Sequence, residues 1–162
     1  MVPSSGTLEA PAAVRGSAPP GLDGPVLEGF LHRVLKDWMG LKAEHFADRE
    51  DAGTSLPLEA MLRFSDPFAG VLVVRSVPEF ASVLAAKTSC LDLDPFIVLV
   101  VRVWREMVRD LYAVEMKDVQ PCRYRTSRPA DWPQRAPDAA SLSLVGRWPL
   151  EMRLWKGAED LR

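Results

Sequence analysis

The segment FIVLVVRVWREMVRDLYA, residues 96–113, decides the fold, because it joins the most apolar run of the chain to a set of regularly spaced charges. Asp94 and Pro95 come directly before it, and these residue types suit the N-cap and the first position of a helix. We predict a helix that begins at Pro95 and continues to about Glu115. No other segment predicts a longer regular element.

Two faces result when this helix is wound at about 100° per residue. One face is apolar and is expected to lie on a sheet; it holds Ile97, Val100, Val101, Trp104, Val108 and Leu111. Another face gathers Arg102, Arg105, Glu106 and Arg109. Glu106 follows Arg102 by four residues and precedes Arg109 by three, so each arginine can reach its carboxylate along the helix surface. These charged residues form either a solvated face with weak ion pairs or a working surface.

The sequence predicts two further helices. Residues 26–40 repeat apolar side chains at helical intervals, at Val26, Phe30, Val34, Leu35 and Trp38. Gly40 follows them as a stop signal. Another helix is expected to begin at Pro78. Its cap is either Ser76 or Val77; the choice stays open because Val77, which precedes the proline, resists helical geometry.

Strand patterns flank the predicted helices. Residues 58–64, LEAMLRF, alternate in the way of a strand with one buried face, which holds Leu58, Ala60, Leu62 and Phe64. The turn SDPFAG and the run VLVVRS then complete an antiparallel hairpin. Residues 141–145 and 148–155 predict a second hairpin joined by a glycine turn, with Trp155 on the face opposite Leu154.

Weaker signals come from the segments that remain. Alternation after Leu41 indicates a short strand that runs into an exposed polar loop. Residues 121–140 are rich in proline and polar side chains, which favours an irregular connection. Together the patterns predict one α+β domain over residues 25–156, with an antiparallel sheet packed against helices. Residues 1–24 are expected to form a flexible N-terminal tail and residues 157–162 a C-terminal tail.

The composition argues against nucleic-acid and membrane binding. Twenty basic and 22 acidic residues leave a net charge of −2, so no global field attracts nucleic acid or an anionic membrane. The basic residues around Tyr124 therefore predict a solvated loop rather than a stacking surface; they are Arg123, Arg125 and Arg128. The longest apolar run, Phe96–Val101, is far shorter than the ~20 residues that cross a bilayer. Because the N-terminus also lacks a signal pattern, we expect a cytoplasmic protein.

Sequence motifs for cofactors, metals and common enzymes are missing. The chain contains no GxSxG elbow, no GxxxxGK loop and no GxGxxG turn. Cys90 and Cys122 form no CxxC pair, and with His32 and His45 they lack the spacing of a zinc site. We therefore expect no cofactor and no metal. Both histidines are interpreted as ordinary surface or boundary residues, and His45 has no predicted partner.

The order of the predicted elements resembles the CheC/CheX-type chemotaxis phosphatase fold. An initial helix comes first, followed by LEAMLRFSDPFAGVLVVRS as a glycine-bearing hairpin, VPEFASVLAA as a short helix, and a long helix with a central glutamate. The resemblance covers roughly residues 26–156 and ends on a terminal hairpin. In that family the long helix carries a Glu-x-x-Asn signature, usually followed by a glycine one turn later. In EMVRDLYA, Glu106 matches the glutamate, whereas Arg109 stands at the asparagine position and Ala113 at the glycine position.

The resemblance implies removal of a phosphoryl group from the aspartate of a CheY-like response regulator. In the family, the glutamate helps to dock the regulator and the asparagine amide orients the attacking water. An arginine has only hydrogen-bond donors and cannot accept a hydrogen bond from water. The resemblance therefore gives Glu106 and Arg109 as catalytic candidates with weak or absent phosphatase activity. It gives as partner-binding candidates Arg102, Arg105, Glu106 and Arg109.

Three functions remain open at this point. The first is a divergent CheX-like module that binds a response regulator or another signalling protein. The second is an active aspartyl-phosphate phosphatase in which a different residue orients water. The third is a structural or assembly module whose charged helix stripe is merely solvated and whose sheet mediates self-association. The family commonly dimerises through its sheet, so the resemblance also makes a homodimer plausible.

Overall fold

The computed structural model describes residues 21–46, 56–64, 68–88, 94–112, 123–126, 133 and 135–157. Its helices are α2 (Gly24–Met39), α4 (Pro78–Thr88) and α5 (Pro95–Tyr112). Its strands are β1 (Ala43–His45), β2 (Leu58–Phe64), β3 (Gly70–Ser76), β4 (Arg123–Thr126), β5 (Ala139–Val145) and β6 (Trp148–Lys156). The predicted α+β class is confirmed.

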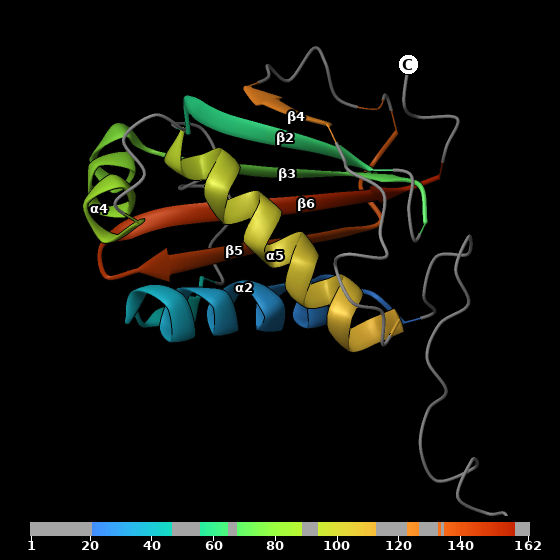
Figure 1. Ribbon diagram of the computed structural model, residues 1–162, viewed down its shortest axis with the longest axis horizontal. Helices are drawn as coiled ribbons and strands as arrows, with labels where there is room; N and C mark the ends of the chain where they lie inside the picture. Colours follow the sequence, from blue (N-terminus) through green and yellow to red (C-terminus); the bar gives the residue numbers. More distant parts are fainter. Residues whose placement is uncertain are drawn as a thin grey trace, which may run out of the picture.

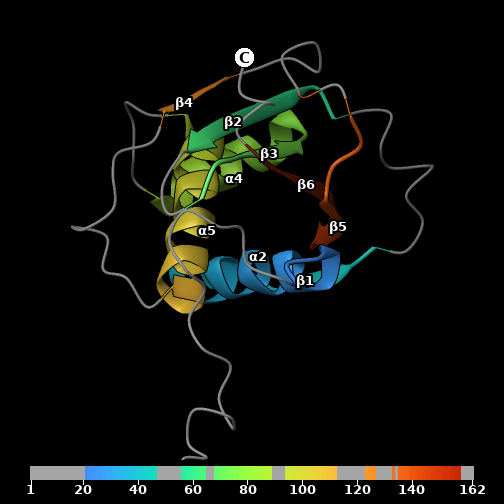
Figure 2. The same cartoon turned by 90° about the vertical axis from the view of Figure 1, so that its right-hand side faces the viewer.

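All the strands belong to one antiparallel sheet with the order β1-β5-β6-β3-β2-β4. Helix α5 crosses the face of this sheet diagonally, with α4 beside its first turn and α2 along the β5 edge (Figure 1). The view turned by 90° shows that the sheet curves around the helices (Figure 2). Helix α5 packs on β2 and β3, α2 packs on β5, and the two helices contact each other. This contact positions the site described below.

Helix α5 begins where the sequence predicts. The Oδ1 atom of Asp94 accepts a hydrogen bond from the backbone N–H of Phe96 at 2.8 Å, and the Asp94 carbonyl accepts another from Val98 at 3.1 Å. Pro95 occupies the first helical position, where its missing N–H costs nothing. The helix is described as far as Tyr112, so its expected continuation to Glu115 lies outside the described residues.

The other two helices also follow their sequence signals. The side chain of Asp23 caps α2 by accepting a backbone N–H at 3.0 Å, and Gly40 ends it with a left-handed φ of 67°. Helix α4 starts at Pro78. The carbonyl of the preceding residue, Val77, accepts a hydrogen bond from the N–H of Phe80 at 3.1 Å. Val77, rather than Ser76, therefore occupies the cap position.

The buried face of α5 is broader than the predicted stripe. Ile97, Val101 and Leu111 lie at its partly buried margins. The fully buried set includes residues that the prediction omitted, namely Phe96, Leu99, Val103, Met107 and Tyr112. The reason is that α5 contacts α2 and α4 as well as the sheet, so a wider arc of the helix is covered. Within the described ranges, no helix combines the length and the apolarity needed to cross a membrane.

The prediction of one buried face for β2 was wrong. Ala60, Leu62 and Phe64 face the helices, as expected. Met61 is only 1% exposed and packs on the opposite face of the sheet in a second apolar cluster, with Val71, Val73 and Trp155. Trp155 does lie opposite Leu154, and its indole N–H donates to the carbonyl of Arg135 at 2.8 Å.

The irregular connection predicted for residues 121–140 contains a short strand. β4 pairs with β2 in antiparallel register, with Ala60 opposite Thr126 and Leu62 opposite Tyr124. The strand has four residues, which is too short for an alternating pattern to stand out from the surrounding polar sequence. Most of the remainder of this segment lies outside the described residues. The second predicted hairpin is confirmed, because β5 and β6 pair across a turn at Gly146.

Candidate functional site

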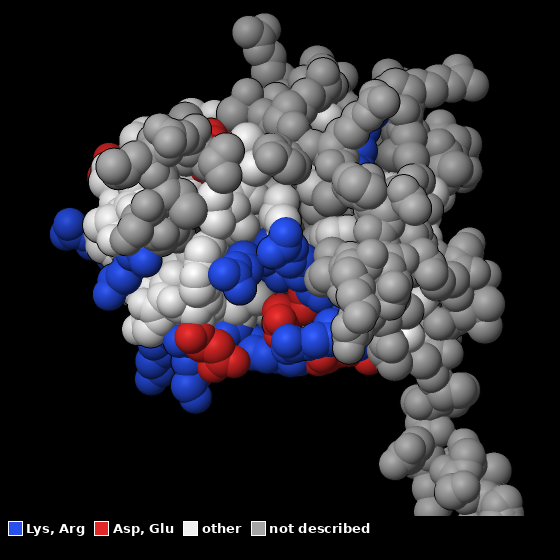
Figure 3. All heavy atoms as spheres, viewed as in Figure 1, with Lys and Arg blue, Asp and Glu red and all other residues white. Residues whose placement is uncertain are grey.

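An open groove of about 220 Å³ lies between α2 and α5. We call it the α2/α5 groove; it is lined by Arg33, Val34, Asp37, Trp38, Arg102, Glu106 and Arg109. Basic and acidic side chains gather side by side over this part of the surface, between the two helices (Figure 3). The groove is therefore polar and charged, unlike the apolar pockets that usually hold small organic ligands.

Four charged residues join the two helices; three of them line the groove, and Asp110 lies beside it. The Oε1 atom of Glu106 accepts a hydrogen bond from Arg109 at 2.6 Å and lies 3.7 Å from the guanidinium of Arg33. Arg33 also donates to Asp110 at 2.5 Å, and Arg109 lies 3.8 Å from the other oxygen of Asp110. We call these four residues the ion-pair ring. The ring is electrically neutral, since two arginines face two carboxylates.

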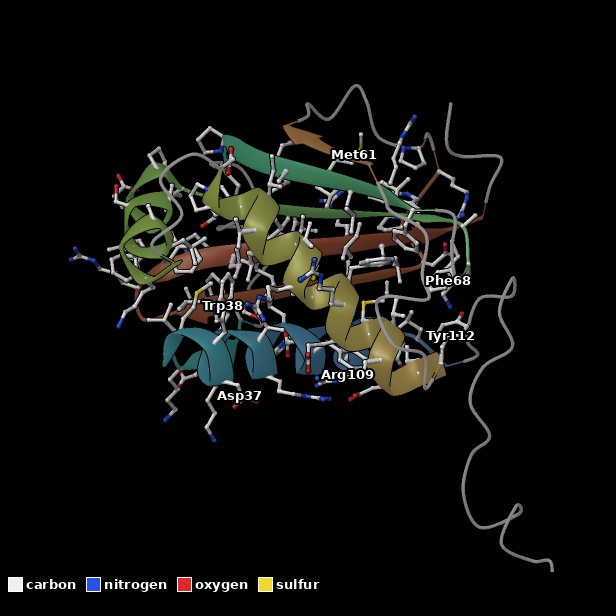
Figure 4. All side chains as sticks on the ribbon, viewed as in Figure 1. Asp37, Trp38, Met61, Phe68, Arg109 and Tyr112 are labelled. Carbon is white, nitrogen blue, oxygen red and sulfur yellow. The ribbon has the colours of Figure 1, made fainter. Side chains whose placement is uncertain are left out.

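Arg102 does not belong to this ring. It was predicted to reach Glu106, but the structure has no ion pair between these two described residues. The guanidinium carbon of Arg102 instead lies 4.4 Å from the centre of the Trp38 ring on α2, within the range of a cation–π interaction. Trp38 is on the side of α2 that faces α5, and Arg109 lies toward the C-terminal end of α5 (Figure 4). The competing aromatic face explains why the predicted pair with Glu106 does not form.

Arg105 is exposed on α5 but does not line the groove. Of the four predicted partner-binding residues, the structure therefore brings Arg102, Glu106 and Arg109 together. Arg105 forms no ion pair with any carboxylate in the described part of the chain.

Sequence reasoning missed the half of the groove that α2 supplies. Arg33 and Asp37 are one helical turn apart in HRVLKDW, so they share a side of α2, and Trp38 follows directly. The helical pattern of this segment was visible, but the crossing of α2 over α5 is a tertiary feature that one helix cannot reveal. Trp38 was assigned to the apolar face of its helix and in fact lies partly buried at the groove.

The groove offers strong hydrogen-bond donors and little that could activate water. Arg109 is 62% exposed, but it has no acceptor atom and already donates to Glu106. Glu106 is 22% exposed and is engaged by two arginines. Groups of three or more histidine, cysteine, aspartate or glutamate side chains that could hold a metal ion do not occur among the described residues. Recognition of an acidic partner is the chemistry that this arrangement supports best.

A separate polar cluster lies where α2 meets β5 and β1. The Nε2 atom of His32 is 2.8 Å from the hydroxyl of Ser143, which donates to Glu28 at 3.3 Å. Glu28 also lies 2.9 Å from Nδ1 of His45, so the prediction that His45 has no partner was wrong. Ser143 is 111 positions from His32, and His45 is 17 positions from Glu28, so neither contact follows from the spacing within one helix or strand.

This cluster makes stability depend on pH. Burial lowers the pKa of His32 below its ordinary value of 6.5, while Glu28 raises it and His45 lowers it. The unfolded chain therefore binds a proton at His32 more readily than the folded protein does. The free energy of unfolding is expected to decrease as the pH falls below about 6.5, and His32→Gln should make that decrease shallower. Urea unfolding between about pH 5 and pH 8 measures both slopes. Identical slopes would contradict this assignment.

Comparisons with known proteins support the fold. No family model matches the chain, and no curated protein matches it. Among solved structures, the chain resembles the crystal structure of the CheX-CheY-BeF3-Mg+2 complex from Borrelia burgdorferi, with a TM-score of 0.50 and 12% sequence identity. The match covers 80% of this chain and 94% of the other. At this level of identity the likeness concerns the fold alone, and it shows that the α+β domain has a CheX-like architecture.

Proposed function

We propose that this chain is a divergent CheX-like signalling module that binds the receiver domain of a response regulator through the α2/α5 groove. We further propose that it has weak or no activity toward an aspartyl phosphate. The observation that carries the proposal is the 2.6 Å hydrogen bond from Arg109 to Glu106, because these residues occupy the two signature positions of the resembling family. The choice of partner is supported by the CheX-like fold, since the similar solved structure contains CheX with CheY.

Hydrolysis of an aspartyl phosphate needs a group that holds a water molecule toward phosphorus. An amide serves because it both donates and accepts hydrogen bonds. Arg109 lacks an acceptor, and its guanidinium is drawn back onto Glu106 on its own helix. Arginine can stabilise charge on a phosphoryl group, yet it cannot orient the attacking water by accepting a hydrogen bond from it. Binding without efficient turnover is the expected result.

The charge of the groove suits an acidic partner. The ion-pair ring is neutral, so the charges of the lining that remain are those of Arg102 and Asp37, and Arg102 is the arginine that a negative surface can reach. An exposed arginine of this kind favours contact with a negative surface and disfavours contact with a basic one. The phosphoacceptor surface of a receiver domain is rich in carboxylates, so it has the complementary sign. On this account the protein acts in the cytoplasm, and self-association as a homodimer is proposed from the family resemblance.

Phosphate release separates a binding module from an active phosphatase. We expect phosphorylated receiver domains to lose phosphate at the same rate with and without this protein, although they bind it. A real-time assay of inorganic phosphate, run beside a binding measurement on the same receiver, tests both statements. Acceleration by the wild type that disappears in Glu106→Ala would contradict the proposal. Glu44→Gln is the matched control, because it removes an exposed carboxylate on β1, away from the groove.

A further inference from the structure

The charged residues of the groove are not equally available to a partner. Arg33 and Arg109 are engaged by Glu106 and Asp110 at distances between 2.5 and 3.8 Å. A partner that recruited either arginine would first have to break a contact that joins or orders the helices. Exposed ion pairs are weak singly, but four linked charges resist the loss of any one member. The ring is therefore better suited to bracing α2 against α5 than to making the first contact with a partner.

Arg102 lies in a different environment. Its guanidinium rests over the Trp38 ring at 4.4 Å, and it forms no ion pair with a carboxylate in the described part of the chain. The indole packs partly against the core, so it supplies a fixed platform from α2 for a side chain that comes from α5. An arginine that already rests against a fixed aromatic ring loses less conformational freedom when it binds. Its guanidinium carries five N–H donors that a carboxylate can accept from.

The opposing charges narrow the choice of ligand. Asp37 and Glu106 line the same groove as Arg102, and Asp37 has no ionic partner within the described ranges. A dianionic phosphoryl group entering the groove would be repelled by both carboxylates, whereas a carboxylate carries half that charge. Arg102 is the one arginine of the lining outside the neutral ring, so a single guanidinium is available to a single carboxylate. A bidentate guanidinium fork is also the geometry that recognises a carboxylate most specifically.

We propose that Arg102, presented by Trp38, is the main anchor of the groove and binds one carboxylate side chain on the acidic surface of the receiver partner. The ion-pair ring holds the two helices at the spacing that this stack requires. The inference rests on the proposed function and deepens it by assigning the contact to a pair of residues from two helices. Trp38 becomes a positioning residue, since it acts through Arg102.

Affinity measurements on single variants test this assignment. The probe is a CheY-type receiver loaded with BeF3− and Mg²⁺, titrated calorimetrically into each protein. We expect Arg102→Ala to weaken binding by at least about tenfold, as truncation of an anchor residue does. Arg102→Lys should lose most of the same factor, because lysine is a point charge without the planar fork. Trp38→Leu should weaken binding less than Arg102→Ala, because the guanidinium survives but loses its platform.

The turn between β5 and β6 offers a matched control. Arg147 is also exposed and also lies over an indole ring, at 5.4 Å from the centre of Trp148. Arg147→Ala removes the same kind of contact from a residue that does not line the groove, and it should leave the affinity unchanged. Thermal unfolding of every variant checks that the fold is retained. A loss with Arg147→Ala equal to the loss with Arg102→Ala would overturn the assignment.

The carboxylate itself is identified by double-mutant cycles. Acidic surface residues of the receiver are neutralised one at a time and titrated against wild type and Arg102→Ala. One receiver variant should weaken wild-type binding and abolish the effect of Arg102→Ala, which shows that the two groups touch. Additive losses with every acidic residue would overturn the carboxylate assignment. Wild-type affinity retained in Arg102→Ala would overturn the anchor and leave the proposed function standing. Absence of wild-type binding to receivers would overturn both.

Discussion

Trp104→Ala is expected to lower the free energy of unfolding by about 3–5 kcal/mol, the range typical for removing a large buried aromatic side chain. Trp104 is 2% exposed and lies on the inner side of α5, with its ring centre 6.0 Å from that of Phe64 on β2. The substitution would leave a cavity at the point where α5 rests on the sheet. Urea unfolding followed by circular dichroism measures the loss.

Trp148→Ala is the natural comparison for this experiment. Trp148 stacks on Phe80 with ring centres 6.0 Å apart, but it is only partly buried at the start of β6. A smaller destabilisation is expected there, since less surface returns to water and the neighbourhood can relax. If the two substitutions lowered the free energy of unfolding equally, the deeper burial of Trp104 would not give it a larger share in stability, which would contradict this prediction. Partner binding should also fall with Trp104→Ala, because α5 carries one side of the groove.

Arg109→Asn is expected to raise the rate of receiver dephosphorylation by about 10²-fold over the wild type, a contribution within the range of a positioned group that acts on a reacting water. The substitution supplies an amide with both a donor and an acceptor at the position next to Glu106 on the helix. It also frees Glu106 from its 2.6 Å contact with the guanidinium. The measurement is single-turnover phosphate release from a phosphorylated receiver domain.

Arg109→Ala distinguishes the role of the amide from relief of crowding. It removes the guanidinium and frees Glu106 in the same way, but it leaves nothing to hold water. We expect its rate to remain at the wild-type level. Equal acceleration by the alanine and asparagine variants would mean that Arg109 only blocks access, and that another residue orients water. That result would favour the active-phosphatase alternative.

The sequence predicted the local elements well because their ends carry strong chemical signals. Asp94 and Pro95 begin α5, Gly40 ends α2, and short apolar runs separated by glycine-bearing turns mark both hairpins. These features act over a few residues, so one chain is enough to read them. The short strand β4 was missed because pairing with β2, and not its own pattern, makes it a strand.

The site could be predicted only in part. The charges on α5 followed from helical spacing, and the pair between Glu106 and Arg109 forms as expected. The partner of Arg102 could not be predicted in this way, because Trp38 approaches from another helix and takes the place of the expected Glu106. The cluster of His32 with Ser143 joins residues 111 positions apart for the same reason. Contacts between distant segments depend on packing, which residue spacing does not encode.

The most direct test of the account is nuclear magnetic resonance of the ¹⁵N-labelled protein during titration with a receiver domain carrying BeF3− and Mg²⁺. Docking at the α2/α5 groove should shift the backbone signals of α2 and α5 along the groove and the indole N–H signal of Trp38. The indole signal of Trp155, buried on the opposite face of the sheet, should stay in place. Shifts centred on Trp155 and its strand, with the Trp38 signal unmoved, would contradict docking at the α2/α5 groove.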